Sequence, residues 1–340
     1  MDRSRNSVFV VVPNWNGAER LAACLDSLLA QSLAARVVVV DNGSVDGSLA
    51  LLEKYPAVEV IRHSRNLGFA GGVNAGFRRA IEEGADYVAA FNNDAVADKR
   101  WLEELVKCLA ANPAAGIAAC KLLSADGRHL DSTGDYYTVW GLPYPRGRGE
   151  AGLDKYDSAV EIFGASGGAS LYRVAMLQAV GLFDEDFFAY YEDVDLSFRA
   201  QLAGWKVRYA PAAVAYHAIG ATSGQIKGFA TYQTVKNLPM LFWKNVPPGR
   251  IFISVLPRFT LAYLAIIGSA LRRGQVWPVA KGWAVYAWLL PKKLAQRYRI
   301  QRARQVSKDY IWSLLIHDLP PNARALRRLR AGWRKRRCKP

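Results

Sequence analysis

Short runs of apolar, β-prone residues alternate with segments of helical periodicity through the first part of the chain. The runs at 8–13, 36–40, 58–61 and 86–91 are typical of buried strands. Leucines recur at helical spacing over residues 18–31, and helices are also predicted over 44–55 and from the glycine-rich stretch to residue 83. Strands that alternate with helices predict a parallel, doubly wound α/β sheet.

Polar or glycine-rich loops follow each of these apolar strands, at 13–17, 41–44, 65–72 and 92–94. The carboxyl ends of parallel strands meet at one edge of a sheet, where ligands bind in open α/β folds. One polar loop would be ordinary turn chemistry, but four on one edge indicate a binding site.

The pattern weakens beyond residue 116. Strands are predicted at 117–123, 162–172 and 205–209, and residues 136–149 read as a long aromatic and basic loop, of the kind that often forms a lid. Residues 192–204 carry an apolar helical face, and Asp195 and Arg199 form an i,i+4 pair on that helix. Glu192 and Asp193 therefore lie at a helix N-terminus, where negative charge is favoured even without any chemical role.

Several residues at the loop edge have both a chemical and a structural interpretation. Asp94 could hold Mg²⁺ or Mn²⁺ beside a phosphate, or it could cap the following helix. Asp41 could accept a hydrogen bond from a ribose or a base, or form an Asx-turn. The glycines 68, 71, 72 and 76 allow either helix–sheet packing or close approach of a sugar or phosphate. His217 could face the cation, although a lone histidine is more often structural.

Other nucleotide-binding patterns are absent from the sequence. No G-x-G-x-x-G follows the first strand, which argues against a dinucleotide site, and no G-x-x-x-x-G-K-[ST] occurs, which argues against a P-loop. The four cysteines lack metal-ligand spacing and fit reduced thiols in a cytosolic compartment. The first residues run directly into a strand, so no signal peptide is expected.

Charge divides the chain unevenly. Residues 219–340 hold 24 Lys and Arg and two acids, whereas residues 1–218 have a net charge of −6. We therefore expect a globular domain over 1–225, with halves at 1–121 and 122–225, and a basic, Trp-rich helical region over 226–340. The apolar stretch 251–271 is interrupted by Pro257 and Arg258, and its remainder is too short to cross a bilayer. Monotopic attachment to an anionic membrane surface is favoured, with a true span, or nucleic-acid binding by the tail 324–339, as alternatives.

Five segments together resemble family 2 of the glycosyltransferases, which has the GT-A fold: residues 12–17 (VPNWNG), 41–48 (DNGSVDGS), 66–76 (NLGFAGGVNAG), 91–94 (FNND) and 188–199 (FAYYEDVDLSFR). They occur in the family's order over roughly residues 8–217. The likeness is nearest to bacterial rhamnosyltransferases and galactofuranosyltransferases of surface-glycan synthesis.

The resemblance implies a role for each matching residue. Asp193 is the expected catalytic base, with Glu192 beside it. Asp94 and His217 are the expected metal ligands; the first acid of the family's D-x-D is replaced by Asn92, which could weaken metal binding. The expected nucleotide-sugar contacts are Pro13, Asn14, Asn16, Asp41, Asn66, Gly71, Gly72, Asn74, Asn92 and Asn93.

The function expected from this resemblance is a metal-dependent, inverting transfer of a sugar, rhamnose being one candidate, from a UDP- or dTDP-sugar. The acceptor would be a hydroxyl of a glycan or a polyprenyl-diphosphate-linked glycan, at the cytoplasmic face of the inner membrane. A sugar nucleotidylyltransferase, or a membrane-bound nucleotide-sugar or glycan-binding protein without activity, are the alternatives. A nucleotidylyltransferase would need a glycine-rich, basic loop after the first strand, which this chain lacks. Nucleic acid is not expected as a partner, and the oligomeric state is not indicated.

Overall fold

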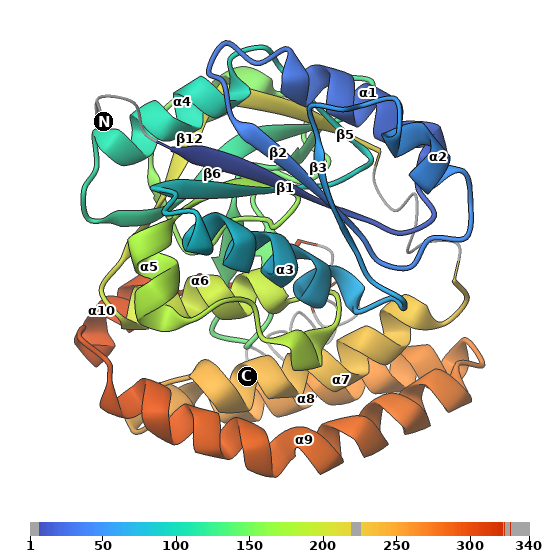
Figure 1. Ribbon diagram of the computed structural model, residues 1–340. Helices are drawn as coiled ribbons and strands as arrows, with labels where there is room; N and C mark the ends of the chain where they lie inside the picture. The colour runs from blue at the N-terminus through green and yellow to red at the C-terminus, as the bar shows by residue number, and fades with distance from the viewer. Residues whose placement is uncertain (1–6, 219–225, 322, 324–326, 328–340) are drawn as a thin grey trace, which may run out of the picture. The chain divides into compact units, whose positions relative to one another are not determined.

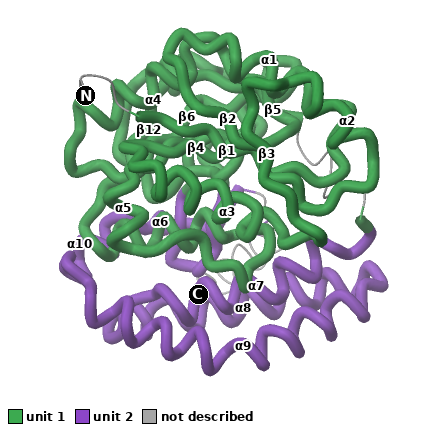
Figure 2. Tube along the Cα trace, viewed as in Figure 1, with its two compact units in different colours: residues 1–135, 145–226 green, residues 136–144, 227–340 purple. Residues whose placement is uncertain are grey.

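The computed structural model describes residues 7–218, 226–321, 323 and 327 (Figure 1). Most of the basic tail 324–339 and the first six residues lie outside this range. Two compact units make up the chain (Figure 2): the first contains residues 1–135 and 145–226, and the second contains 136–144 and 227–340.

One large sheet forms the centre of the first unit, in the strand order β10-β12-β6-β11-β4-β1-β2-β3. Strands β1, β2, β3 and β4 pair in parallel, with Val10 opposite Val37 in β1 and β2. The other half is mixed, because β11 runs antiparallel to both β4 and β6 while β12 is parallel to β6. The strands of this sheet are β1 (Val8–Asn14), β2 (Arg36–Asp41), β3 (Glu59–Arg62), β4 (Tyr87–Phe91), β5 (Ala95–Ala97), β6 (Ala115–Ser124), β7 (Leu130–Ser132), β10 (Glu161–Ile162), β11 (Ala169–Arg173) and β12 (Lys206–His217).

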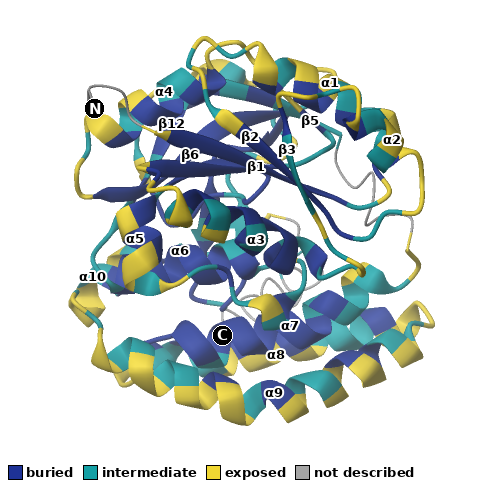
Figure 3. Cartoon of the chain, in the orientation of Figure 1, coloured by how far each residue is buried: buried dark blue, intermediate teal, exposed yellow. Residues whose placement is uncertain are grey.

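Helices cover both faces of this sheet, as the predicted α/β fold class requires (Figure 1). Alternate residues of β1 enter two separate cores: Val10 belongs to the same core as Leu25 of α1 and Leu102 of α4, whereas Val11 belongs to the same core as Val73 of α3. Buried residues therefore concentrate on the strands and on the inner sides of the helices (Figure 3). The helices are α1 (Ala18–Leu29), α2 (Ser48–Leu52), α3 (Gly68–Glu82), α4 (Trp101–Ala110), α5 (Val174–Val180) and α6 (Glu192–Leu202), with short 3₁₀ turns η1 (Leu153–Tyr156) and η2 (Glu185–Phe187).

Two predicted elements are shorter or more broken than the sequence pattern indicated. The helix expected over 44–55 is reduced to α2, because Asp46 accepts hydrogen bonds from the N–H groups of Ala18 and Ser48 and so holds a turn before it. The single strand expected over 162–172 is two strands, β10 and β11. Between them Gly164 leaves the sheet edge to pair with Asp135.

The predicted long loop over 136–149 contains a hairpin instead. Strand β8 (Asp135–Tyr137) pairs with β9 (Pro143–Pro145). Between these strands, the N–H of Val139 donates to the carbonyl of Ile316, and both residues belong to the second unit. The strand expected over 205–209 is longer than predicted: it continues to His217 as β12, which is irregular between Ala210 and Val214.

The second unit is helical, with α7 (Phe229–Asn245), α8 (Arg250–Arg272), α9 (Val276–Arg302) and α10 (Lys308–Leu314). The expected interruption at Pro257 and Arg258 is wrong, since both lie inside the continuous helix α8. Helix α8 packs on α7 through stacked rings of Phe259 and Phe242, 4.3 Å apart. Among the described residues α8 is the one helix long and apolar enough to cross a membrane.

Candidate active site

The carboxyl ends of β1, β2 and β4 meet in a layer of hydrogen-bonded polar side chains. Asn14 is fully buried, and its amide nitrogen donates to Asp41 Oδ1 (3.3 Å) and to Ser44 Oγ (3.2 Å). Asn93 donates its Nδ2 hydrogen to Asn14 Oδ1 at 2.7 Å. Asp41 also accepts from the Ser44 N–H (3.0 Å), so the expected turn around it is formed. The predicted edge residues are therefore brought together by mutual contacts.

Two other residues predicted to contact the nucleotide-sugar lie at the end of β1 and in the loop after it. Pro13 is buried in β1, opposite Val40 of β2. Asn16 is exposed with a positive φ of 50°, and its Oδ1 accepts from the N–H of Val45 at 2.8 Å. Asn16 thus joins the loop after β1 to the loop after β2 and presents an exposed side chain beside them.

The residues of the loop after β3 and of α3 that are predicted to contact the nucleotide-sugar differ in their surroundings. Asn66 Oδ1 accepts from the Gly68 N–H at 2.7 Å, which shapes the entry to α3. A Cβ at Gly72 would lie 2.6 Å from the amide nitrogen of Asn42, and one at Gly71 would lie 2.7 Å from the Leu67 Cβ, so both glycines serve close packing. Asn74 is buried and turned away from the polar edge.

The amide of Asn74 is used to hold the segment before α6. Its Nδ2 donates to the carbonyl of Phe183 (2.9 Å) and to Glu185 (3.0 Å), and its Oδ1 accepts from the N–H of Phe183. This gives Asn74 a structural task in the fold.

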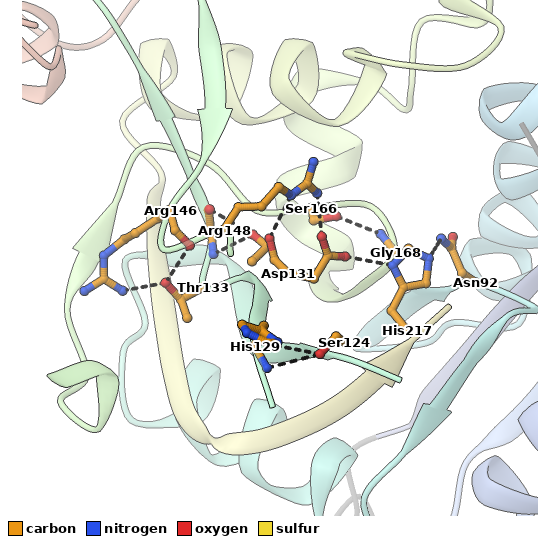
Figure 4. A network of polar contacts seen from close by, with 12 residues as sticks. Asn92, Ser124, His129, Asp131, Thr133, Arg146, Arg148, Ser166, Gly168 and His217 are labelled. Carbon is orange, nitrogen blue, oxygen red and sulfur yellow. Dashed lines mark hydrogen bonds and ion pairs between the residues drawn. The ribbon is translucent and has the colours of Figure 1, made fainter. Parts of the chain in front are cut away.

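His217, at the end of β12, belongs to the polar network in Figure 4, where it contacts Asp131 and Asn92. Its register opposite Ala95 of β5 brings Nε2 within 3.1 Å of Asp94 Oδ1, and Asn92 Nδ2 is also 3.1 Å from Nε2. Its Nδ1 lies 2.8 Å from Asp131 Oδ2. Burial opposes a charge on this ring, but the hydrogen bonds and negative charges of Asp131 and Asp94 prevail and raise the pKa of His217 to about 9.

Asp94 is available to a ligand because it is not used as a helix cap. The short strand β5 follows it, and α4 begins only at Trp101, so the capping interpretation does not apply. No group of three or more His, Cys, Asp and Glu with the arrangement of a metal site occurs in the described part of the chain.

The pair formed by Asp94 and His217 nevertheless fits a divalent cation bound jointly with a substrate. Neighbouring ligands of an octahedral ion at about 2.1 Å lie about 3 Å apart, as do Asp94 Oδ1 and His217 Nε2. Mg²⁺ usually takes only one or two protein ligands and completes its shell with phosphates and water. Asp94 and His217 can therefore supply two of the ligands of such an ion.

Asp193 is the second residue of α6 and is held by backbone N–H groups. Its Oδ2 accepts from Gly167 (2.9 Å) and its Oδ1 from Val194 (2.8 Å). Burial raises the pKa of Asp193, although these hydrogen bonds oppose the shift. A carboxylate with a raised pKa is a stronger base, which suits proton abstraction from a hydroxyl. Glu192 beside it is buried.

The turn at Gly167 and Gly168 connects the two carboxylate positions. The Gly168 carbonyl accepts from the Asn92 N–H at 2.8 Å, two residues before Asp94, while Gly167 donates to Asp193. Side chains would be crowded at this turn, since a Cβ at Gly168 would lie 3.2 Å from the amide nitrogen of Asn92 and one at Gly167 would lie 3.0 Å from the ring of Phe69. Asp94 and Asp193, far apart in sequence, are thus connected through one two-residue turn.

Sequence reasoning missed three charged residues of this site. Asp131, on β7, is buried between His217 and Arg148; despite burial, the hydrogen bond from His217 and the charge of Arg148 keep its pKa below the usual range. Asp135, on β8, is buried, and burial together with the negative charge of Asp193 raises its pKa to about 8. All three come from 124–150, where periodicity is weak, so no pattern pointed to them.

A mixed sheet of this order, with carboxylates at its open edge, is the framework of glycosyltransferases with the GT-A fold. Among solved structures, the mannosyltransferase of Pyrobaculum calidifontis with GDP-Man and Mn²⁺ has a TM-score of 0.53 at 19% identity, covering 92% of this chain and 88% of that one. TarS 1–349 of S. aureus with UDP gives 0.53 at 16% identity, covering 87% and 89%. At these identities they show the fold alone.

Residues 9–181 match the family model for glycosyl transferase family 2, and the chain belongs to this family. It is similar to the N-acetylglucosaminyl-diphospho-decaprenol L-rhamnosyltransferase of Mycobacterium tuberculosis, 29% identical over 64% of this chain and 77% of the relative. The dTDP-rhamnosyl transferase RfbF of Shigella flexneri is 28% identical over 72% and 82%, and a galactofuranosyltransferase of M. tuberculosis is 30% identical over 58% and 66%. The protein is a glycosyltransferase, as predicted, and its relatives are those the sequence motifs indicated.

Proposed function

We propose that this protein transfers a sugar, with rhamnose the first candidate, from a dTDP- or UDP-sugar to a hydroxyl of a lipid-linked glycan, with inversion at the anomeric carbon. The observation that carries this proposal is the link between Asp193 and the pair Asp94–His217 through the Gly167–Gly168 turn. Two relatives named as rhamnosyltransferases support the choice of sugar, and one of them carries dTDP-rhamnosyl in its name.

The donor is proposed to lie along the open edge of the parallel strands. The exposed side chain of Asn16 and the half-buried amides of Asn92 and Asn93 offer hydrogen bonds to ribose or phosphate. Asp41 and Asn14, both buried, are proposed to shape the base and ribose pocket from beneath. Asn66, Gly71 and Gly72 would let the start of α3 approach the donor closely, and Asn74 would hold that helix in place.

Mg²⁺ or Mn²⁺ is proposed to bind between Asp94, His217 and the donor diphosphate. When bound, such an ion stabilises the negative charge that develops on the leaving nucleoside diphosphate. Solved structures of similar fold that contain Mn²⁺ support the use of a divalent ion. Asn92 in place of an acid adds a hydrogen bond without charge to this position.

Asp193 is proposed to accept the proton of the acceptor hydroxyl as its oxygen attacks the anomeric carbon from the side opposite the diphosphate. A positioned base contributes roughly 10²–10⁴-fold to such a reaction. The hydrogen bonds from Gly167 and Val194 fix the orientation of this carboxylate, and Glu192 lies buried beside it at the start of α6. A single displacement of this kind inverts the configuration at the anomeric carbon.

Substitution of Asp193 by Asn tests this assignment. The amide keeps the size of the side chain but cannot take up the proton, so we expect donor binding within a few-fold of wild type and transfer slowed at least roughly 100-fold. Binding is measured calorimetrically with UDP- and dTDP-sugars plus Mn²⁺, and transfer by release of the nucleoside diphosphate. The matched control is Asp154→Asn on η1, which should leave both unchanged. Near wild-type transfer by the Asp193 variant would remove this residue from the role.

The second unit is proposed to attach the enzyme to an anionic membrane surface at the cytoplasmic face of the inner membrane. Helices α8 and α9 expose an unusual set of large apolar side chains: Ile253, Leu261, Leu264, Leu271, Val276, Trp277, Trp283, Trp288, Leu294 and Tyr298. Residues 219–340 hold 24 Lys and Arg and two acids, so the same region is strongly basic. Apolar and Trp side chains combined with basic ones are typical of helices that lie in a membrane interface.

Attachment along the surface is favoured over a span by α8 itself. The buried side of α8 is committed to α7, through the stacked rings of Phe259 and Phe242 and the hydrogen bond from Tyr263 to the carbonyl of Val235. A bilayer crossing by α8 without α7 would break this contact. A lipid-linked acceptor would meet the enzyme at the same surface, as the acceptor named for the mycobacterial relative suggests.

A further inference from the structure

We propose that Asp131 is a positioning residue for the metal site: it holds the His217 imidazole so that Nε2 is directed at Asp94 and offered to the cation. This inference rests on the proposed metal-dependent function. It concerns a residue that no sequence motif of the chain marked.

The geometry around His217 is that of a ring held from both sides. Asp131 Oδ2 lies 2.8 Å from Nδ1, and Asp94 Oδ1 lies 3.1 Å from Nε2 (Figure 4 shows the Asp131 contact). The two strands responsible, β7 and β12, both pair with β6, which fixes the positions of Asp131 and His217 relative to each other. A neutral imidazole carries one N–H, and a carboxylate on Nδ1 keeps the proton there and leaves the Nε2 lone pair for a metal.

The position of Asp131 is energetically unfavourable for an unpaired carboxylate. Its side chain is only 2% exposed, and a buried carboxylate is costly unless it is paired. Its second oxygen, Oδ1, forms an ion pair with Arg148 at 2.6 Å, and the Nε of Arg148 donates to the Asp131 backbone carbonyl at 3.1 Å. The carboxylate is therefore clamped in one orientation by Arg148 while its other oxygen faces His217.

Arg148 reaches this carboxylate from the surface, since about half of its side chain is exposed. Its contribution is indirect: without it Asp131 could rotate and the hydrogen bond to Nδ1 would weaken. We expect Arg148→Gln to lower metal affinity less than loss of Asp131 does, because Asp131 would still face His217.

The experiment compares Asp131→Leu with Asp131→Asn in the full-length chain. Mn²⁺ affinity is measured by electron paramagnetic resonance with UDP and, separately, dTDP present. Loss of a carboxylate partner of a metal-bound histidine typically weakens metal binding 10–100-fold, which we expect for Leu. Asn keeps an oxygen that can accept from Nδ1–H, so its affinity should recover to within about fivefold of wild type. Asp157→Asn, which removes the carboxylate paired with Lys121, is the matched control and should have no effect.

A second measurement needs no substitution and so does not depend on the folding of the Leu variant. In wild-type protein saturated with Mg²⁺ and nucleotide, ¹⁵N-detected spectra of His217 should show the proton on Nδ1. A proton on Nε2 in that state, or wild-type metal affinity in folded Asp131→Leu, would overturn the proposal. Failure of the wild-type chain to bind Mn²⁺ with either nucleotide would instead overturn the proposed metal-dependent function, and the role of Asp131 with it.

Discussion

At the scale of single residues, the chemistry of the site depends on what surrounds each side chain. His217 by sequence is a lone histidine, but between Asp131 and Asp94 it becomes a group with a pKa of about 9. Asp193 and Asp135 are both carboxyls in buried surroundings, and burial raises the pKa of each. The fold thus brings into one site a histidine that retains its proton (His217) and two carboxyl groups whose pKa is raised (Asp193 and Asp135).

The raised pKa of His217 predicts that metal affinity increases with pH. Below about pH 9 the ring is protonated without metal, and a cation can bind Nε2 only after displacing that proton. Mn²⁺ affinity should therefore rise roughly tenfold per pH unit between about pH 6.5 and 8, with close to one proton released per ion. Calorimetry in buffers of different ionisation enthalpy measures this release. His217→Gln should bind Mn²⁺ more weakly and without the pH dependence; an unchanged slope in that variant would contradict the assignment.

At the scale of elements, the segment before α6 is fixed to the start of α3 in a strained conformation. Phe188, Tyr190 and Tyr191 all have positive φ, between 64° and 72°, which is rare for aromatic residues. The Phe188 carbonyl accepts from the Ala70 N–H at 3.1 Å, and Gly68 lies directly beneath it. Strain of this kind persists only where surrounding contacts enforce it, and here it immediately precedes Asp193.

Substitution of Gly68 by Ala should break this contact. Gly68 has a φ of 75°, and a Cβ would lie 2.4 Å from the Phe188 carbonyl oxygen, so we expect a loss of about 3 kcal/mol in the free energy of unfolding. Transfer should fall as well, because the segment leading to Asp193 must shift. Gly84→Ala is the control: its φ is 71° but the space is open, so only the backbone cost of about 1 kcal/mol remains. Urea unfolding and the transfer assay measure both; equal losses in the two variants would refute the steric argument.

At the scale of the whole molecule, the two parts of the chain have net charges of opposite sign. The first 218 residues have a net charge of −6 and fold around a sheet, whereas the remainder is basic and presents exposed Trp side chains on helices. Trp277 and Trp288 are each more than 70% exposed. Basic charge draws such a protein to anionic lipid, and apolar insertion retains it.

The double variant Trp277→Ser/Trp288→Ser should bind anionic vesicles at least roughly tenfold more weakly, because each inserted ring contributes more than 1 kcal/mol of apolar burial. Flotation with vesicles of anionic and of neutral lipid, at low and high salt, measures this. Binding should fall with salt and be weak on neutral lipid. Leu29→Ser, which removes an exposed apolar side chain of the first unit, should bind as wild type. Irreversible, salt-resistant insertion would favour a span of α8 instead.

The sequence by itself determined the parallel strands and their polar ends, because alternation of apolar strands and amphipathic helices is a local property. It also identified the family, since motifs such as 91–94 and 188–199 are contiguous in the chain. The Asp195–Arg199 pair, predicted from spacing alone, is present at 2.8 Å.

Only the tertiary structure could decide which side chains meet. Asp131 and His217 are 86 residues apart and are neighbours because β7 and β12 flank β6. The hairpin β8–β9, the split between β10 and β11 and the unbroken helix α8 through Pro257 likewise depend on pairing and packing with distant segments. Local pattern fixes which elements form, whereas the positions of a buried carboxylate and its partner depend on sheet order, which no local pattern encodes.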